Sequence, residues 1–73
     1  MLLQIHEPSG YFIGQVRKRG ARTWETVTGR CRSGEAALAK ALLAMRPSDS
    51  RARALFVDRD DWYASRVFME AAK

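Results

Sequence analysis

The fold is decided by residues 11–45, which read YFIGQVRKRGARTWETVTGRCRSGEAALAKALLAM. Residues 11–18 and 23–32 both carry aromatic and β-branched side chains, which favour strands. Between them, the glycine at Gly20 suits a tight turn. The stretch therefore predicts two antiparallel strands joined as a hairpin, followed by a helix.

Alternation along these two strands sorts their side chains onto two faces. The first face is apolar or small: Phe12, Gly14, Val16, Val27, Gly29 and Cys31. The second face is mostly polar, aromatic or cationic: Tyr11, Ile13, Gln15, Arg17, Arg19, Trp24, Thr26, Thr28, Arg30 and Arg32. We expect the first face to pack in the core and the second to point away from it.

The helix is predicted to begin after Ser33, whose hydroxyl suits an N-cap, and to end before Pro47. Glu35 in the first turn complements the helix dipole. An apolar stripe at helical spacing is predicted to lie on the core face of the sheet. Its members are Leu38, Ala41, Leu42 and Met45.

Outside this central region, residues 2–7 and 52–57 are predicted to be strands and residues 58–61 a turn. The C-terminal segment allows two structures. A helix capped by Asp61 is the preferred one, and a strand over residues 66–70 that pairs back onto residues 52–57 is the alternative. We therefore expect one α+β domain over residues 1–73, in the order β-β-β-α-β followed by a helix or a fifth strand, with an antiparallel sheet packed on one helix.

Charge and cysteine content limit the classes of function. The net charge is +5, and ten of the thirteen basic residues are arginine, which favours an anionic partner. With one cysteine and one histidine, the chain lacks the ligands for a four-ligand metal site and cannot form an internal disulfide. No apolar run approaches the roughly 20 residues that span a bilayer. We expect a cytoplasmic protein with no membrane partner and no cofactor.

The second face of the hairpin is the candidate functional site. Arginine can contact phosphates, glutamine can reach base edges and indole can stack on bases. The predicted nucleic-acid-binding residues are Arg17, Arg19, Arg22, Arg30, Arg32, Gln15 and Trp24. The alternative is that this face is merely solvated, with Trp24 and Ile13 packed under the C-terminal segment.

Catalysis is not predicted. A pairing of Cys31 with His6 would need an exposed, ionised thiol, whereas the face assignment places Cys31 in the core. The spacing of the acidic residues matches no metal-binding loop and fits a solvated turn. These residues are Asp58, Asp60, Asp61 and Glu70. There is no phosphate-binding loop and no nucleophile motif.

A protein-interaction module is the alternative function. Trp62, Tyr63 and Phe68 could anchor a protein partner, because aromatic side chains dominate interface energetics. A chain of this size also buries a small core, so self-association would supplement its stability. The sequence thus predicts either a nucleic-acid partner or a protein partner, the latter as a homodimer or as an inhibitor of a larger assembly.

The hairpin and helix start resemble the AP2-like, three-stranded DNA-binding domains at the N-termini of phage-type integrases. The resemblance rests on Gly10, Tyr11, Val16, Gly20, Trp24 and residues 33–36. It implies a sheet placed in the DNA major groove. The helix start here is one residue shorter than the pattern usual in that family, and the strand at 52–57 is an addition to it. In size and element order the chain is also similar to small phage and prophage proteins, including inhibitors of bacterial defence systems.

Overall fold

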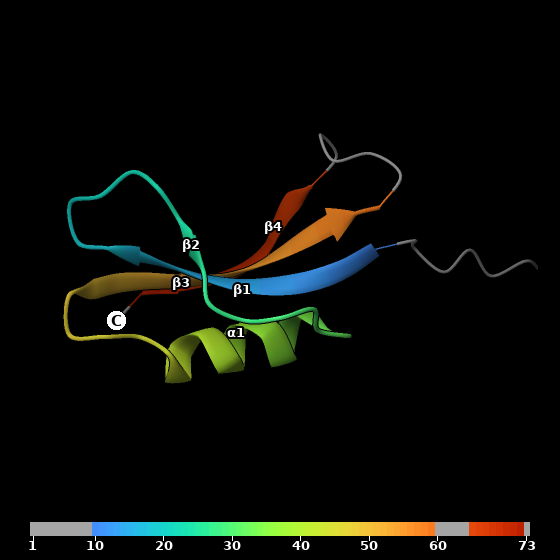
Figure 1. Ribbon diagram of the computed structural model, residues 1–73, viewed down its shortest axis with the longest axis horizontal. Helices are drawn as coiled ribbons and strands as arrows, with labels where there is room; N and C mark the ends of the chain where they lie inside the picture. The colour runs from blue at the N-terminus through green and yellow to red at the C-terminus, as the bar shows by residue number, and fades with distance from the viewer. Residues whose placement is uncertain (1–9, 60–64, 73) are drawn as a thin grey trace, which may run out of the picture.

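The structure is a computed structural model that describes residues 10–59 and 65–72. Its elements are β1 (Gly10–Lys18), β2 (Glu25–Thr26), α1 (Gly34–Leu43), β3 (Asp49–Asp58) and β4 (Arg66–Ala72). The strands form one antiparallel sheet in the order β2-β1-β3-β4, and α1 packs against one face of it (Figure 1). The predicted α+β class with one helix on an antiparallel sheet is confirmed, whereas the order of the elements is β-β-α-β-β over the described residues.

The central pair of strands, β1 and β3, is built from small residues on the side that faces α1. Gly14 lies opposite Ala54 and Val16 opposite Ala52, and both alanines are fully buried. A Cβ atom at Gly14 would lie 2.4 Å from the carbonyl oxygen of Ala37 in α1. The helix therefore approaches the sheet more closely than larger side chains would allow.

The core lies between α1 and the sheet in two small clusters. The first contains Val16, Ala41 and Ala52, with Val27, Leu38 and Met45 packed against it. The second contains Cys31, Ala37 and Ala54, with Phe12, Leu38 and Met69 packed against it. The prediction that the helix packs on the face of Phe12, Val16 and Val27 is confirmed. The prediction that Leu42 belongs to the apolar stripe facing the core is wrong, because Leu42 is 42% exposed. Ala37 is buried in the core.

Both ends of α1 are fixed by side chains close in sequence. The Ser33 hydroxyl accepts a hydrogen bond of 3.1 Å from the backbone N–H of Ala36, which confirms the predicted N-cap. After the helix, the buried Asp49 carboxylate accepts hydrogen bonds from the backbone N–H and the guanidinium of Arg46. These contacts set the turn that leads into β3.

The strand predicted at residues 23–32 is shorter in the structure, where it is β2 (Glu25–Thr26). Only Glu25–Thr26 pairs regularly with β1. Beyond it, the backbone N–H of Gly14 donates its hydrogen bond to the Thr28 hydroxyl and not to a backbone carbonyl. The Thr28 methyl group lies against Gly14 on the α1 side, so its predicted position on the second face is wrong. The chain rejoins β1 at Cys31, which exchanges two backbone hydrogen bonds with Phe12.

The preferred prediction for the C-terminal segment, a helix, is wrong, and the alternative hairpin is correct. β4 pairs along β3 from Ala72 opposite Arg51 to Arg66 opposite Phe56. The register shifts where Phe68 forms a bulge opposite β3. Residues 66–72 form a strand and not a helix because the edge of β3 has backbone N–H and C=O groups that need hydrogen-bond partners, and β4 supplies them.

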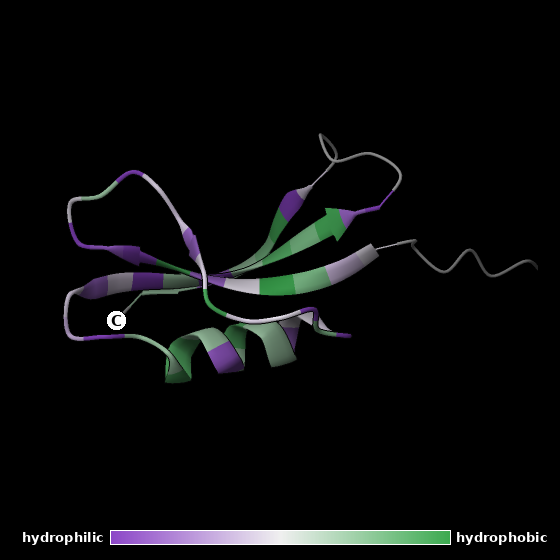
Figure 2. Cartoon of the chain, viewed as in Figure 1, coloured by the Kyte–Doolittle hydropathy of each residue, from purple (hydrophilic) through white to green (hydrophobic). Residues whose placement is uncertain are grey.

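Hydropathy divides β3 along its length, with hydrophilic residues in its first half and hydrophobic residues in its second (Figure 2). The strand predicted at residues 2–7 lies outside the described residues, as does His6. Within the described part of the chain, no helix has both the length and the apolar character needed to cross a bilayer.

Candidate functional site

The sheet face opposite α1, which we call the outer face, carries four of the seven predicted nucleic-acid-binding residues, namely Gln15, Arg17, Trp24 and Arg30. Because side chains alternate along each strand, the register assigns residues from all four strands to it. They are Tyr11, Ile13, Gln15, Arg17, Thr26, Arg51, Arg53, Leu55, Val57, Val67 and Glu70. The C-terminal residues 66–72 lie within the sheet as β4 and so do not cover Trp24 in the way one interpretation of the sequence proposed.

Two arginines converge on one tryptophan on the outer face. The guanidinium carbon of Arg53 lies 4.1 Å from the centre of the Trp24 ring, and that of Arg17 lies 5.2 Å from it. The pairing of β1 with β2 brings Trp24 beside Arg17, and the pairing of β1 with β3 brings Arg53 beside Gln15. We call Arg17, Trp24 and Arg53 the tryptophan cluster.

Gln15 holds this cluster in place. Its side-chain oxygen accepts a hydrogen bond of 2.8 Å from Arg53 Nε, and its side-chain nitrogen donates one of 3.1 Å to the Thr26 hydroxyl. Only 9% of Gln15 is exposed. The amide is thus engaged at both ends, and Gln15 orients Arg53.

The tryptophan cluster carries more positive than negative charge. Burial away from water lowers the pKa of the Arg53 guanidinium, the negative charge of Glu70 partly opposes that shift, and the positive charge of Arg17 adds to it. Glu70 pairs directly with Arg51 at 2.8 Å. Among the described residues, the buried Nε of Arg17 has no hydrogen-bond partner. A negative charge placed beside Arg53 would oppose the lowering of its pKa.

A second cation–aromatic pair lies further along β1. The guanidinium carbon of Arg30 lies 4.5 Å from the centre of the Tyr11 ring. The bridge between Phe12 and Cys31 holds the two segments together at this point. Tyr11 and Arg17 are six residues apart on one strand, so the two clusters are about 20 Å apart.

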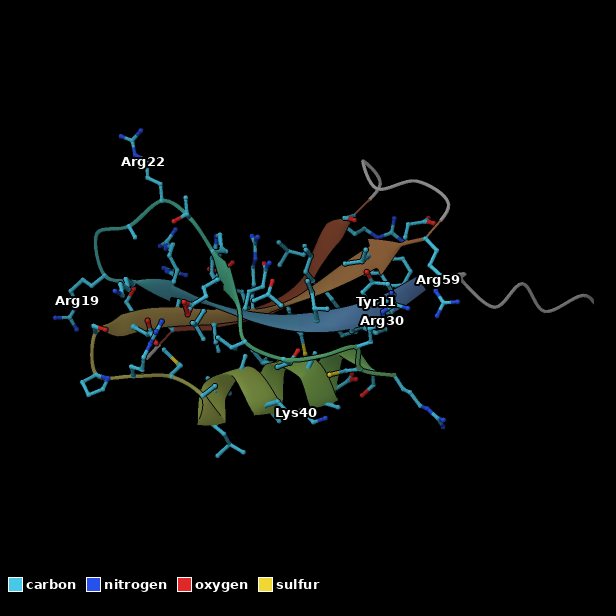
Figure 3. All side chains as sticks on the ribbon, viewed as in Figure 1. Tyr11, Arg19, Arg22, Arg30, Lys40 and Arg59 are labelled. Carbon is cyan, nitrogen blue, oxygen red and sulfur yellow. The ribbon has the colours of Figure 1, made fainter. Side chains whose placement is uncertain are left out.

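The remaining predicted cations lie at the margins of the outer face. Arg19 and Arg22 are exposed in the connection between β1 and β2, at the opposite end of the sheet from Tyr11 and Arg30 (Figure 3). Arg32 is exposed just after the bridge. These three residues are within the basic surface but contact neither aromatic ring.

The sequence prediction missed Arg53 and its neighbour Arg51, which come from β3. The alternation of arginine with small residues at 51–54 was the available signal. That alternation points to the candidate site only if β3 is known to lie next to β1, and no local pattern indicates which strands are neighbours.

Of the three predicted protein-interface residues, only Phe68 lies within the described part of the chain. Trp62 and Tyr63 lie outside the described residues. Phe68 is 49% exposed and packs edge-on against Phe12, with ring centres 5.1 Å apart, on the α1 side. A cleft of about 250 Å³ opens beside it. Its walls are Phe12, Phe56, Arg66, Val67 and Phe68.

Cys31 lies in the core as predicted, with 7% of its surface exposed. Its thiol is directed at the Thr28 hydroxyl and the Gly29 carbonyl, at 3.9 and 3.6 Å. Within residues 10–59 and 65–72, no three His, Cys, Asp or Glu side chains are grouped so as to hold a metal ion.

Comparisons with known proteins give no match: no protein-family model fits the chain, and neither the curated proteins nor the solved structures show significant similarity to it. The resemblance to integrase N-terminal domains therefore rests on the quoted residues alone.

Proposed function

We propose that this chain is a small, non-enzymatic nucleic-acid-binding protein that uses the outer face of its sheet. The observation that carries the proposal is the tryptophan cluster, where Arg17 and Arg53 meet on Trp24 and the neighbouring Glu70 is already paired with Arg51. A phosphate is the anion that suits such a site. Arginine presents planar donors to phosphate oxygens, and an indole ring beside it offers a surface for a base.

The rest of the outer face supports the same function. Arg30 and Tyr11 supply a second cation–aromatic pair, and Arg19, Arg22 and Arg32 extend the basic surface beyond the strands. The net charge of +5 attracts a polyanion at long range. In this proposal the arginines contact phosphates, Trp24 lies nearest the bases, and Gln15 keeps Arg53 in position.

A titration of fluorescent DNA and RNA, both single-stranded and duplex, at two salt concentrations tests the proposal. Binding should weaken steeply as salt rises, because each phosphate contact releases counterions. Arg30→Gln should lower affinity for all of these nucleic acids and reduce the salt slope by about 1. Lys40→Gln is the matched control, since Lys40 is exposed on α1, away from the outer face (Figure 3).

Two results would refute the proposal. One is the lack of salt-dependent binding at low salt. The other is an equal loss of affinity in Arg30→Gln and Lys40→Gln, which would mean that net charge alone attracts the nucleic acid. Circular dichroism of each variant establishes that the fold is intact.

Self-association through the cleft beside Phe68 is the second candidate function. Val67 and Phe68 are 45% and 49% exposed, and a small domain gains stability by covering such side chains with a second copy of itself. Val67→Lys should then shift the protein towards monomer in light scattering. Leu43→Lys is the control, because Leu43 is 89% exposed on α1 and outside the cleft. A monomeric wild type at high concentration would exclude this candidate.

A further inference from the structure

The outer face has a chemical pattern that suits unpaired bases better than a duplex, and we propose that its preferred ligand is single-stranded nucleic acid. This inference rests on the proposed nucleic-acid function and concerns the form of the ligand. Three features of the outer face carry it: its apolar middle, the aromatic rings at its two ends, and the placement of its cations.

The middle of the outer face, between the two cation–aromatic clusters, is apolar. Ile13 lies directly opposite Leu55, and Val67 follows Leu55 on the next strand. Reading base edges in a duplex groove requires hydrogen-bonding side chains at the centre of the contact. The central amide, Gln15, is 9% exposed and engaged at both ends, so it does not serve that role.

Unpaired bases, in contrast, present flat apolar faces that can lie on such a surface. Stacking on aromatic rings or on guanidinium planes is the usual way in which proteins hold single strands. The Trp24 ring with Arg53 and the Tyr11 ring with Arg30 provide a stacking position at each end. The distance of about 20 Å between them accommodates a short segment of roughly four nucleotides, the lower end of the range for single-strand-binding sheets.

The cations are placed to follow one sugar-phosphate backbone. Arg17 and Arg53 flank Trp24, so a phosphate held between them would lie next to a base stacked at that ring. Arg30 repeats the arrangement beside Tyr11. Each end of the outer face thus pairs an aromatic ring with at least one arginine that can contact a phosphate.

The test compares a labelled twelve-nucleotide single strand, as DNA and as RNA, with the matching duplexes by fluorescence anisotropy at one salt concentration. We expect the protein to bind at least one single strand ten-fold or more tightly than its duplex. Trp24→Ala should weaken single-strand binding by five-fold or more, the loss typical of one stacked base, and Trp24→Phe should restore most of it.

The outcomes separate this inference from the proposed function. Salt-dependent binding with equal or tighter affinity for duplexes overturns the single-strand preference and leaves the nucleic-acid function standing. Absence of binding to every probe overturns both. A single-strand preference that persists unchanged in Trp24→Ala overturns the stacking role of Trp24. Should Trp24→Ala fail to fold, Tyr11→Leu against Tyr11→Phe makes the same comparison at the other end.

Discussion

Gly14→Ala is predicted to weaken the contact between α1 and the sheet. The added methyl group would lie 2.4 Å from the Ala37 carbonyl oxygen and 3.0 Å from the Ala41 Cβ. Normal contact distances require the helix to move outward by about 1 Å, because its backbone is the nearest obstacle. Overpacking of this kind costs about 1–3 kcal/mol, and the replacement of a strand glycine returns about 0.5–1 kcal/mol.

The midpoints of these two ranges leave a net loss of about 1.25 kcal/mol, which should lower the melting temperature of a domain this small by about 5–10 °C. Urea and thermal unfolding followed by far-ultraviolet circular dichroism measure it. Gly29→Ala is the matched control, because a Cβ at Gly29 would meet no atom within 4 Å and its φ angle is not positive. The reasoning fails if Gly14→Ala unfolds at the wild-type midpoint, or if Gly29→Ala loses as much stability.

Three further changes test other contacts by the same unfolding measurements. Ser33→Ala removes the N-cap of α1 and should cost about 1 kcal/mol. Hydrogen bonds from Arg46 hold the pKa of Asp49 below its ordinary value, so their stabilisation is present above pH 4 or so and is lost as the pH falls through the lowered pKa. Asp49→Asn should therefore be less stable at neutral pH and show a weaker loss in acid; an unchanged acid profile would contradict this. Arg51→Ala with Glu70→Ala should change stability by less than about 1 kcal/mol, because both side chains of that ion pair are accessible to solvent.

Local patterns predicted the parts of the fold that local forces determine. The cap at Ser33 acts within one helical turn, and the alternation of residues 11–18 is a property of one strand. That alternation placed Phe12 and Val16 in the core and Gln15 and Arg17 on the outer face, which is where the structure has them. The core assignment of Cys31 followed from the same pattern.

Features that depend on which strands are neighbours could not be predicted in this way. Glu70, Ala71 and Ala72 favour a helix locally, yet the free edge of β3 draws the segment into the sheet. Arg53 reaches the candidate site only because β3 lies beside β1. The role of Gln15 was likewise hidden, since its two partners come from different strands.

The strand order has a consequence for how the chain folds. The two central strands, β1 and β3, join residues that are 31 to 48 positions apart, from Lys18 with Asp49 to Gly10 with Asp58. Closing so long a loop costs entropy before any pairing energy is gained, which slows folding relative to a sheet of consecutive hairpins. The entropy cost of loop closure is lowest at the pair Lys18 and Asp49, because α1 shortens the connection there. Pairing of β1 with β3 should therefore begin at this end and proceed towards Gly10 and Asp58. During synthesis on the ribosome, β1 has no partner in the centre of the sheet until β3 has emerged, and the domain must wait for nearly its whole length before it can fold.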